Sequence, residues 1–318
     1  MTLSNMDQPL LRDGASVRVI APSRWIEKSV ADDVLKQSET SGLDVSFSEQ
    51  CFRQHHQLAG DDGERAREFE QVMADPSVDA VWFGRGGYGA GRMMEHVDWS
   101  RLTALCGGQP HKVVIGYSDA TPLLECVSRL GMAWAVHGAM PVDVMSEANR
   151  DAPKKLLQDL IATPRGELNQ RALARCSAVR PGVASGPLRG GNLTLLTNML
   201  FGDHRMRFAG SILVIEDVEE YDYAIDRDLL CLRQAGVLAE LAAIVIGQFT
   251  KTILSSVPFD QTVAEMVLHH TREFDFPILQ GLPSGHGTPN EPLLIDDVLG
   301  FSAIDGSMTW SRPQSDVG

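Results

Sequence analysis

The residues best suited to covalent chemistry lie in the segment 113–124, VVIGYSDATPLL. Its apolar run predicts a buried strand that ends at Gly116, and the polar residues after it predict a tight turn and the start of a helix. A serine in such a turn projects its hydroxyl while helix-start amides face the group that it attacks. Gly116, Ser118 and Ala120 match the GxSxG turn of hydrolases with one small residue changed. Ser118 is therefore a candidate nucleophile, and the alternative is that Ser118 or Asp119 only caps the helix.

A glycine-rich loop precedes this turn in the chain. Gly84, Gly86 and Gly89 follow a predicted strand and satisfy GxGxxG, the dinucleotide-binding pattern. The acidic residue expected about 20 positions later is missing, because 101–112 contains neither Asp nor Glu. The other use of the loop is to bring the backbone amides of Gly86 or Gly87 close to a reacting carbonyl. Turns after neighbouring parallel strands meet at the carboxyl edge of the sheet, so this loop and the serine turn are expected side by side.

Candidates for a base and its orienting carboxylate lie further along the chain. His137 ends a predicted strand, where a histidine can act as a base but more often bonds a loop. A predicted strand at 211–215 passes directly into Glu216, where a carboxylate can orient a histidine, although an acidic run also fits a solvated loop. His286 stands between two glycines, which leave its imidazole on open backbone. Residue types and spacing alone do not select among these side chains.

Composition restricts the class of protein. The chain has 318 residues, of which 43% are hydrophobic and 22% charged, and its formal net charge is -14. That length suits two domains, and the acidic balance argues against nucleic acid or an anionic membrane and favours a small molecule or peptide as the partner. The first ten residues lack a signal-peptide pattern and no apolar stretch reaches about 18 residues, so a cytoplasmic location is expected. The five cysteines include no CxxC pair, so neither a disulfide framework nor a metal site is predicted.

The order of elements predicts an α/β protein of two domains. Strands and helices alternate over residues 1–150, a polar linker is expected at 151–184, and residues 185–318 form the second domain. The expected strands include 16–23, 43–48, 78–83, 211–215 and 242–249, and the expected helices include 26–41, 61–74, 225–235 and 262–272. The segment 186–202 is expected to be a glycine turn that leads into a helix.

Several short motifs follow one another along the chain. They are VIAPS at 19–23, GRGGYG at 84–89, GYSDAT at 116–121, HG at 137–138, GGNL at 190–193, IEDV at 215–218 and GH at 285–286. In this order they resemble the LD-carboxypeptidase family of serine peptidases over most of the chain. The resemblance implies an N-terminal domain with a flavodoxin-like parallel sheet and a smaller, β-rich, barrel-like α+β C-terminal domain. It also implies a homodimer.

The catalytic motifs of the family fall on Ser118, Glu216 and His286. The resemblance therefore implies a triad at a site between the two domains, in which His286 takes the proton of Ser118 and Glu216 orients the imidazole. Asp217 and Glu219 compete with Glu216 for the orienting role. The implied reaction passes through an acyl-enzyme and needs neither a metal nor another cofactor.

The oxyanion that forms during attack needs hydrogen-bond donors close to Ser118. The expected donors are the amide of Asp119, one residue past the nucleophile, and the amide of Gly86 or Gly87. A carboxypeptidase must also recognise a free carboxylate, which calls for a local cation in so acidic a protein. Arg85, beside the proposed oxyanion glycines, is the hypothesis for that contact.

By resemblance, the substrate is a murein-derived tetrapeptide, cut between the L-centre of its diamino acid and the terminal D-alanine. Two alternatives remain open. One is a peptidase that inactivates an antibiotic of the microcin C type. The other is a nucleotide-binding or sensing protein that uses the loop 84–91, with Ser118 acting only as a helix cap.

Overall fold

The chain folds into two compact units. The computed structural model describes residues 6–106, 112–201, 207–253, 256–304 and 307–311. Unit 1 comprises residues 1–168 with 288–295, and unit 2 comprises residues 169–287 with 296–318. The boundary falls within the segment 151–184 that was expected to link the domains, and the return of 288–295 to unit 1 was not expected from the sequence.

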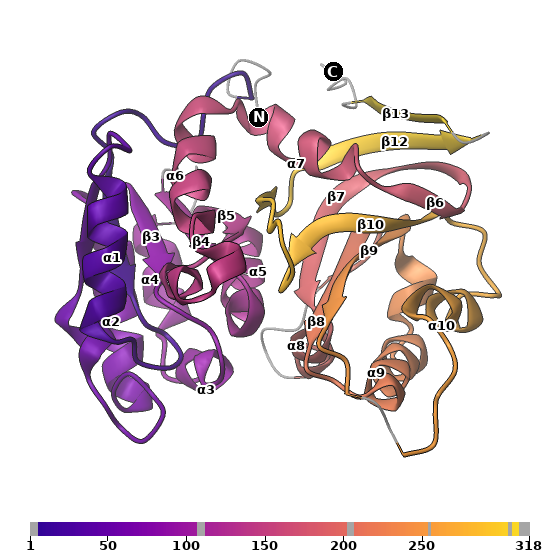
Figure 1. Ribbon diagram of the computed structural model, residues 1–318, viewed down its shortest axis with the longest axis horizontal. Helices are drawn as coiled ribbons and strands as arrows, with labels where there is room; N and C mark the ends of the chain where they lie inside the picture. The colour runs from indigo at the N-terminus through magenta and orange to yellow at the C-terminus, as the bar shows by residue number, and fades with distance from the viewer. Residues whose placement is uncertain (1–5, 107–111, 202–206, 254–255, 305–306, 312–318) are drawn as a thin grey trace. The chain divides into compact units, whose positions relative to one another are not determined.

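Unit 1 is built on a six-stranded sheet with the order β11-β5-β4-β3-β1-β2 (Figure 1). The strands are β1 (Ser16–Ile20), β2 (Asp44–Phe47), β3 (Ala80–Phe83), β4 (Lys112–Gly116), β5 (Ala133–His137) and β11 (Leu293–Leu294). The first five are parallel, and β11 adds an antiparallel edge next to β5. The order 2-1-3-4-5 is that of flavodoxin-like folds, so the predicted class of this part is confirmed.

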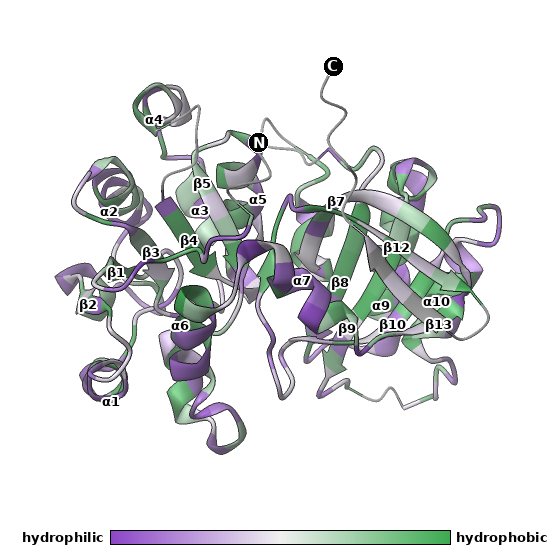
Figure 2. Cartoon of the chain, turned by 90° about the horizontal axis from the view of Figure 1, so that it is seen from above, coloured by the Kyte–Doolittle hydropathy of each residue, from purple (hydrophilic) through white to green (hydrophobic). Residues whose placement is uncertain are grey.

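Helices cover both faces of this sheet because its strands are apolar on both sides. Helices α1 (Lys28–Ser38) and α6 (Ala152–Ala162) pack on one face. The other face is covered by α2 (Asp62–Ala74), α3 (Ala90–Met94), α4 (Trp99–Cys106) and α5 (Thr121–Arg129). Figure 2 shows the hydrophobic strands between helices whose outer faces are hydrophilic. Because the first five strands are parallel, their carboxyl ends lie at one edge of the sheet, where α/β proteins place their sites.

A buried lysine ties the end of α2 to the start of β4. The side chain of Lys112 is 1% exposed, and its ammonium donates to the carbonyls of Asp75 and Val78. Asp75 is the C-cap residue of α2, where backbone oxygens lack a helical partner and a cation is favourable, and Val78 lies in the turn that leads to β3. Lys112 thus fixes the strand that leads to Ser118.

Unit 2 contains a seven-stranded sheet with the order β13-β12-β7-β8-β9-β10-β6, which curls on itself (Figure 1). The strands are β6 (Ser177–Arg180), β7 (Gly182–Asn192), β8 (Ile212–Val218), β9 (Ala243–Thr250), β10 (Ile278–Gly285), β12 (Val298–Ile304) and β13 (Ser307–Ser311). Strands β7 to β10 run parallel, and β6, β12 and β13 are antiparallel to their neighbours. Helices α8 (Leu193–Asn198), α9 (Asp222–Gln234) and α10 (Val263–His270) pack on one side of β8 and β9. The predicted smaller, β-rich, barrel-like α+β domain is confirmed, with a curled sheet that mixes parallel and antiparallel strands.

Two segments differ from the sequence-based expectation. The linker 151–184, expected to be polar helix and turn, forms the helices α6 and α7 (Arg165–Leu173) but also the strand β6 and the start of β7. The expected glycine turn before α8 belongs to β7, whose glycines permit close backbone contact. A Cβ on Gly190, for example, would overlap the carbonyl of Val214 on β8. Glycine-rich strands carry little hydrophobic alternation, which explains why the pattern predicted a turn.

The Lys112 contact predicts a stability effect. Lys112→Ala should lower the free energy of unfolding by roughly 1–3 kcal/mol, because the buried carbonyl of Val78 loses its ammonium donor and the part-buried carbonyl of Asp75 keeps only the Val78 amide. Chemical denaturation followed by circular dichroism measures the effect, and Lys36→Ala on the exposed side of α1 provides the control. Equal midpoints for the two variants would contradict the role given to Lys112.

Candidate active site

Ser118 has a backbone conformation that is rare for a serine. It lies between β4 and the 3₁₀ turn Ser118–Ala120, is partly exposed, and has φ of +63°. A non-glycine residue in this left-handed region costs roughly 1–2 kcal/mol and is found where the surrounding structure enforces it, often at functional sites. A Cβ on Gly116 would lie 2.8 Å from the ring of Phe83 and 2.9 Å from the Cβ of Ala120. The sharp strand-to-helix turn predicted for a displayed nucleophile is therefore present.

The glycine loop after β3 lies directly against this serine. A Cβ added to Gly86 would come within 3.2 Å of the Ser118 hydroxyl oxygen and 3.4 Å of the Asp119 amide nitrogen. Gly87 has φ of +110°, which other residues rarely adopt. The structure thus brings together Ser118, the Asp119 amide and the Gly86 backbone, three components that the sequence predicted at one edge of the sheet.

The side chain of Asp119 joins the loops that follow β1, β3 and β4. It is 3% exposed, and one carboxylate oxygen accepts from the Ser23 hydroxyl at 2.6 Å and from the Ala90 amide at 2.9 Å. Burial raises the pKa of the Asp119 carboxyl, while the Ser23 and Ala90 hydrogen bonds and the charge of Arg65 act in the opposite direction. From the sequence, Asp119 was expected to donate its amide to the oxyanion or, in the alternative, to cap the helix that follows, and the bonds of its side chain to Ser23 and Ala90 were not predicted. One feature of the sequence could have indicated the contact with Ser23, namely that Ser23 follows a buried strand of the same sheet.

Arg65 extends this buried network from α2. Its side chain is fully buried, and one guanidinium nitrogen donates to the carbonyl of Pro22 and, at 2.7 Å, to the carbonyl of Gly89. The other terminal nitrogen pairs with Asp62 on the same helix. A single arginine therefore holds the end of the VIAPS segment and the end of the glycine loop at fixed positions. The Nε atom of Arg65 is also buried and has no hydrogen-bond partner among the described residues, so the two terminal nitrogens make all of these contacts.

In unit 2, Glu216 and His286 form a buried carboxylate–imidazole pair. The Nδ1 atom of His286 lies 2.6 Å from Oε2 of Glu216. The Glu216 side chain is fully buried and that of His286 is 14% exposed. Burial raises the pKa of the Glu216 carboxyl, and the charge and hydrogen bond of His286 lower it in part. A carboxylate at Nδ1 favours the tautomer that carries the proton there, which leaves Nε2 as the basic nitrogen.

Glycines make the space that Glu216 occupies. A Cβ on Gly285, whose φ is +123°, would lie 2.7 Å from Oε2 of Glu216. A Cβ on Gly247 in β9 would lie 3.2 Å from the Cβ of Glu216. The glycine before His286 therefore admits the carboxylate that contacts the imidazole. The sequence had suggested only that the flanking glycines leave the histidine on open backbone.

The two competing carboxylates have other partners. Asp217 accepts from the amide side chain of Asn192 at 2.7 Å and from the backbone of Thr194 at 3.0 Å, so it anchors the start of α8. Glu219 is exposed and pairs with Lys251 at 3.0 Å. Of the acidic side chains considered from the sequence, Glu216 is the one that the structure places at the ring of His286.

His137 takes a packing position in unit 1. It is 1% exposed at the end of β5, and its ring meets the ring of Tyr117 edge-on at 5.7 Å. The Tyr117 hydroxyl in turn donates to Asp143 at 2.8 Å. His137 thus supports Tyr117, the residue that precedes Ser118, in keeping with the alternative to a catalytic base.

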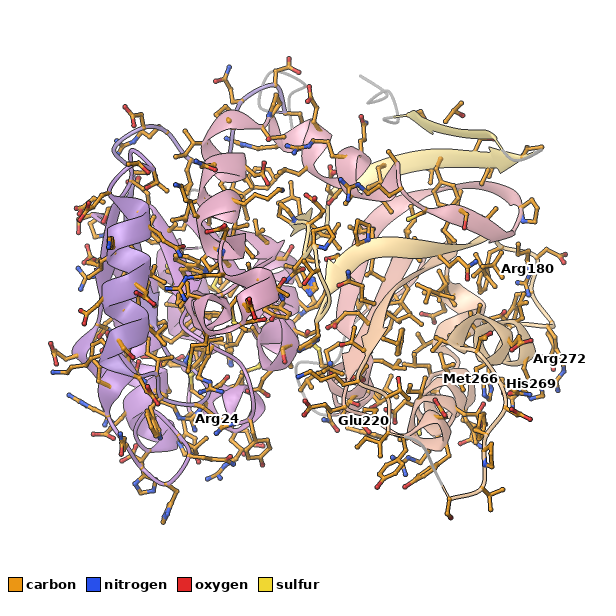
Figure 3. The ribbon with its side chains drawn as sticks, viewed as in Figure 1. Arg24, Arg180, Glu220, Met266, His269 and Arg272 are labelled. Carbon is orange, nitrogen blue, oxygen red and sulfur yellow. The ribbon has the colours of Figure 1, made fainter. Side chains whose placement is uncertain are left out.

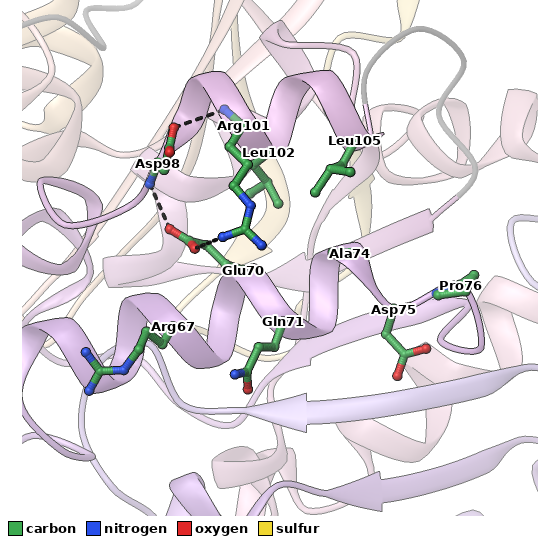
Figure 4. A pocket seen from close by; sticks show the side chains of 10 residues that line it. All are labelled: Arg67, Glu70, Gln71, Ala74, Asp75, Pro76, Asp98, Arg101, Leu102 and Leu105. Atoms are coloured by element: carbon green, nitrogen blue, oxygen red, sulfur yellow. Dashed lines mark hydrogen bonds and ion pairs between the residues drawn. The ribbon is translucent and has the colours of Figure 1, made fainter.

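A surface cleft of about 480 Å³ lies elsewhere in unit 1, between α2 and α4 (Figure 4). Side chains of both charge signs line it, including Arg67, Glu70 and Arg101. None of the residues predicted for chemistry is among its lining residues. The cleft is a polar groove between two helices and not the place where Ser118 acts.

Two further features concern only the part of the chain that the structure describes. No helix there combines the length and the apolar composition needed to cross a membrane. Within the same residues, no group of three or more His, Cys, Asp or Glu side chains gathers in a way that would hold a metal ion.

A parallel α/β sheet that displays a left-handed serine at a strand-to-helix turn has the architecture of a serine hydrolase. The model of the LD-carboxypeptidase N-terminal domain matches residues 17–138, and that of the LD-carboxypeptidase C-terminal domain matches residues 185–298. The chain therefore belongs to the LD-carboxypeptidase family and is a serine-type LD-carboxypeptidase.

Relatives match over nearly the full chain. A probable murein peptide carboxypeptidase of Bacillus subtilis is 30% identical, covering 90% of this chain and 88% of that protein. A murein tetrapeptide carboxypeptidase of Pseudomonas aeruginosa is 31% identical, covering 86% of this chain and 89% of that protein.

Solved structures share the fold. A muramoyltetrapeptide carboxypeptidase from Oxalobacter formigenes has a TM-score of 0.74 at 24% identity, covering 94% of this chain and all of that one. MccF in complex with glutamyl sulfamoyl guanosine has a TM-score of 0.78 at 18% identity, covering 98% of this chain and 99% of that one. At these identities the likeness concerns the fold.

The left-handed serine predicts an unusual order of stabilities. Ser118→Gly should be more stable than Ser118→Ala by about 1 kcal/mol, because glycine adopts positive φ without steric cost. Thermal or urea denaturation of both variants tests this. At Ser128, inside α5, the same two substitutions should show the reverse order, since alanine favours a helix. The same order at both positions would contradict a strained Ser118.

The Asp119 contacts predict a graded effect on turnover. Asp119→Ala should lower kcat more than Ser23→Ala, because it leaves both a buried hydroxyl and a buried amide without their acceptor. Asp119→Asn should retain most activity, since both bonds end on one oxygen that an amide can supply. Steady-state kinetics measure the series. Ser41→Ala is the control, because Ser41 is also a buried serine of unit 1 that bonds a backbone carbonyl. A loss for Asp119→Asn as large as for Asp119→Ala would contradict this account.

Proposed function

We propose that the protein hydrolyses the L,D amide bond that releases the terminal D-alanine of murein-derived tetrapeptides, with Ser118, His286 and Glu216 as its catalytic triad. The left-handed Ser118 beside the glycine loop carries this proposal most directly. The names of two relatives, a murein peptide carboxypeptidase and a murein tetrapeptide carboxypeptidase, support the substrate class. A cytoplasmic location and a homodimer belong to the same proposal.

The first half of the reaction forms an acyl-enzyme. Nε2 of His286 removes the hydroxyl proton of Ser118 as the serine oxygen attacks the scissile carbonyl, which requires these two atoms to come within hydrogen-bonding distance. Glu216 holds the tautomer and stabilises the imidazolium that results. The imidazolium then gives its proton to the departing nitrogen, the C–N bond breaks, and D-alanine leaves with a neutral amine.

Backbone amides stabilise the oxyanion of the tetrahedral intermediate. The proposed donors are the amide of Asp119 and that of Gly86 or Gly87. Their support is the closeness of the loop, since a Cβ on Gly86 would lie 3.2 Å from the Ser118 hydroxyl oxygen and 3.4 Å from the Asp119 amide nitrogen. Loss of one such donor typically costs roughly 2.7–4 kcal/mol of transition-state stabilisation. Backbone donors fixed by a buried network need no reorganisation during the reaction.

The second half of the reaction restores the enzyme. His286, neutral again, takes a proton from water as the water attacks the ester carbonyl of Ser118. The ester bond breaks, the serine oxygen regains its proton, and the shortened tripeptide leaves as a carboxylate. All proton transfers use side chains of this chain, and the proposed mechanism includes no cofactor.

Recognition of the free carboxylate on the terminal D-alanine completes the proposal. Arg85 directly precedes Gly86 in the loop that touches Ser118, and it is half-buried. Arg189, the other arginine near a glycine motif, pairs with Asp296 at 2.5 Å. Arg85 is therefore the preferred contact for the substrate carboxylate.

The triad predicts a clear separation between neighbouring acids. Ser118→Ala should abolish D-alanine release, and Glu216→Gln should reduce kcat by roughly 10²–10⁴-fold, since the imidazole loses the partner that orients it. Asp217→Asn is the matched control and should keep kcat within about tenfold of wild type. Release of D-alanine from purified murein tetrapeptide provides the measurement. A larger loss for Asp217→Asn than for Glu216→Gln would refute the assignment of Glu216.

The same preparation distinguishes the competing functions. Incubation with an acyl sulfamoyl adenosine, followed by detection of the released amino acid, tests the inactivation of a microcin C-type antibiotic. Thermal stabilisation by NAD or ATP without D-alanine release would favour nucleotide binding at the loop 84–91. The proposed function requires that the tetrapeptide be cleaved with a higher kcat/KM than the sulfamoyl compound.

A further inference from the structure

Two arginines from different loops meet beside the glycine loop of unit 1. Arg24 follows β1 and the VIAPS segment, and Arg85 follows β3. Figure 3 shows Arg24 at the end of the unit where α3 lies, and α3 begins directly after the glycine loop. Both side chains are neither fully buried nor fully exposed. They bring positive charge to the carboxyl edge of the sheet in a protein with a formal net charge of -14.

The stem of Arg24 lies across Gly87. A Cβ added to Gly87 would overlap the Cδ of Arg24, and it would lie 3.1 Å from its Cγ and 3.6 Å from its Nε. Any side chain at position 87 would displace Arg24. This close approach therefore gives Gly87 a role besides its positive φ. The stem of Arg24 therefore lies against the same loop in which a Cβ on Gly86 would come within 3.2 Å of the Ser118 hydroxyl oxygen.

Arg85 has a buried donor that the described residues leave unused. Its Nε atom is inaccessible to solvent and has no hydrogen-bond partner among them. Burial lowers the pKa of Arg85, the charge of Arg24 lowers it further, and Glu27 opposes both. An arginine stays charged at neutral pH, so the two guanidinium groups repel each other when nothing anionic is bound.

We propose that Arg24 and Arg85 together form an anion site that binds the free α-carboxylate of the terminal residue of the substrate. This inference rests on the function proposed above and adds Arg24, from a separate loop, as a specificity-determining residue. A carboxylate between the two guanidinium groups neutralises their repulsion and accepts charge-assisted hydrogen bonds from both. Two planar donors also fix its orientation more tightly than one.

The geometry of the reaction fits this site. Only three covalent bonds separate the scissile carbonyl carbon from the carboxylate carbon of a terminal residue. A cation that recognises the carboxylate must therefore lie within one residue length of the oxyanion donors. Arg85 is adjacent to Gly86, and the Arg24 stem covers the next glycine. The site thereby restricts cleavage to the last residue of a chain, which is the defining property of a carboxypeptidase.

A comparison of two substrates tests the proposal. The murein tetrapeptide with its free carboxylate and the same peptide with a C-terminal carboxamide differ only in the group that the arginines would bind. Arg24→Ala and Arg85→Ala should each lower kcat/KM for the free acid by about 10–100-fold while changing that for the amide by less than about threefold. Arg24→Lys should recover part of the loss, since lysine keeps the positive charge but lacks the planar pair of donors that a guanidinium presents to a carboxylate. Arg53→Ala, which removes an exposed arginine of unit 1 paired with Glu64, is the control.

Binding provides a second readout that does not depend on turnover. Calorimetry of the Ser118→Ala protein, which keeps Arg24 and Arg85, should show tighter binding of the free acid than of the amide. Adding Arg24→Ala to this protein should remove the difference between the two peptides. An acid-to-amide ratio that is unchanged in Arg24→Ala, in kinetics and in binding, would overturn the proposal. If Ser118→Ala still released D-alanine, the proposed function itself would fail, which is a separate result.

Discussion

The active edge of unit 1 depends on one buried carboxylate. Asp119 accepts hydrogen bonds from Ser23 after β1 and from Ala90 at the start of α3, and it directly follows Ser118 in the chain. Loops from three adjacent strands are thereby fixed to one another. That rigidity lets Ser118 keep a left-handed conformation that costs energy, and it holds the Gly86 backbone against the serine hydroxyl. The proposed stabilisation of an oxyanion by the amide of Asp119 depends on this rigidity.

In unit 2, the carboxylate of Glu216 is buried beside the ring of His286. Gly247 and Gly285 leave room for Glu216, and its hydrogen bond to His286 satisfies a group that burial would otherwise disfavour. The neighbouring Asp217 accepts hydrogen bonds from Asn192 and Thr194. A basic nitrogen at Nε2 is the consequence. Family membership, the displayed serine of unit 1 and this pair together support a serine peptidase mechanism.

Much of the fold could be predicted from the sequence because its elements are local. The β-branched run at β1 and the capped helix α2, which begins after Asp61, follow from hydrophobic period and turn chemistry. The same reasoning found Ser118 and the glycine loop, since both follow strands of one parallel sheet. It could not find Glu216 as the partner of His286, because 70 residues separate them and the contact forms only in the folded sheet; family resemblance supplied that pair. Strand β7 was missed because its glycines serve close packing with β8, and no local pattern records such a contact.

The central claim is that Ser118 is a nucleophile activated by His286. Covalent labelling with a fluorophosphonate, located by peptide mass spectrometry, tests it most directly. The account predicts near-complete modification of wild type at Ser118 and a labelling rate reduced by roughly 10²-fold or more in His286→Ala, because the hydroxyl then lacks its base. Equal labelling rates in the two proteins, or modification at a different residue, would contradict it.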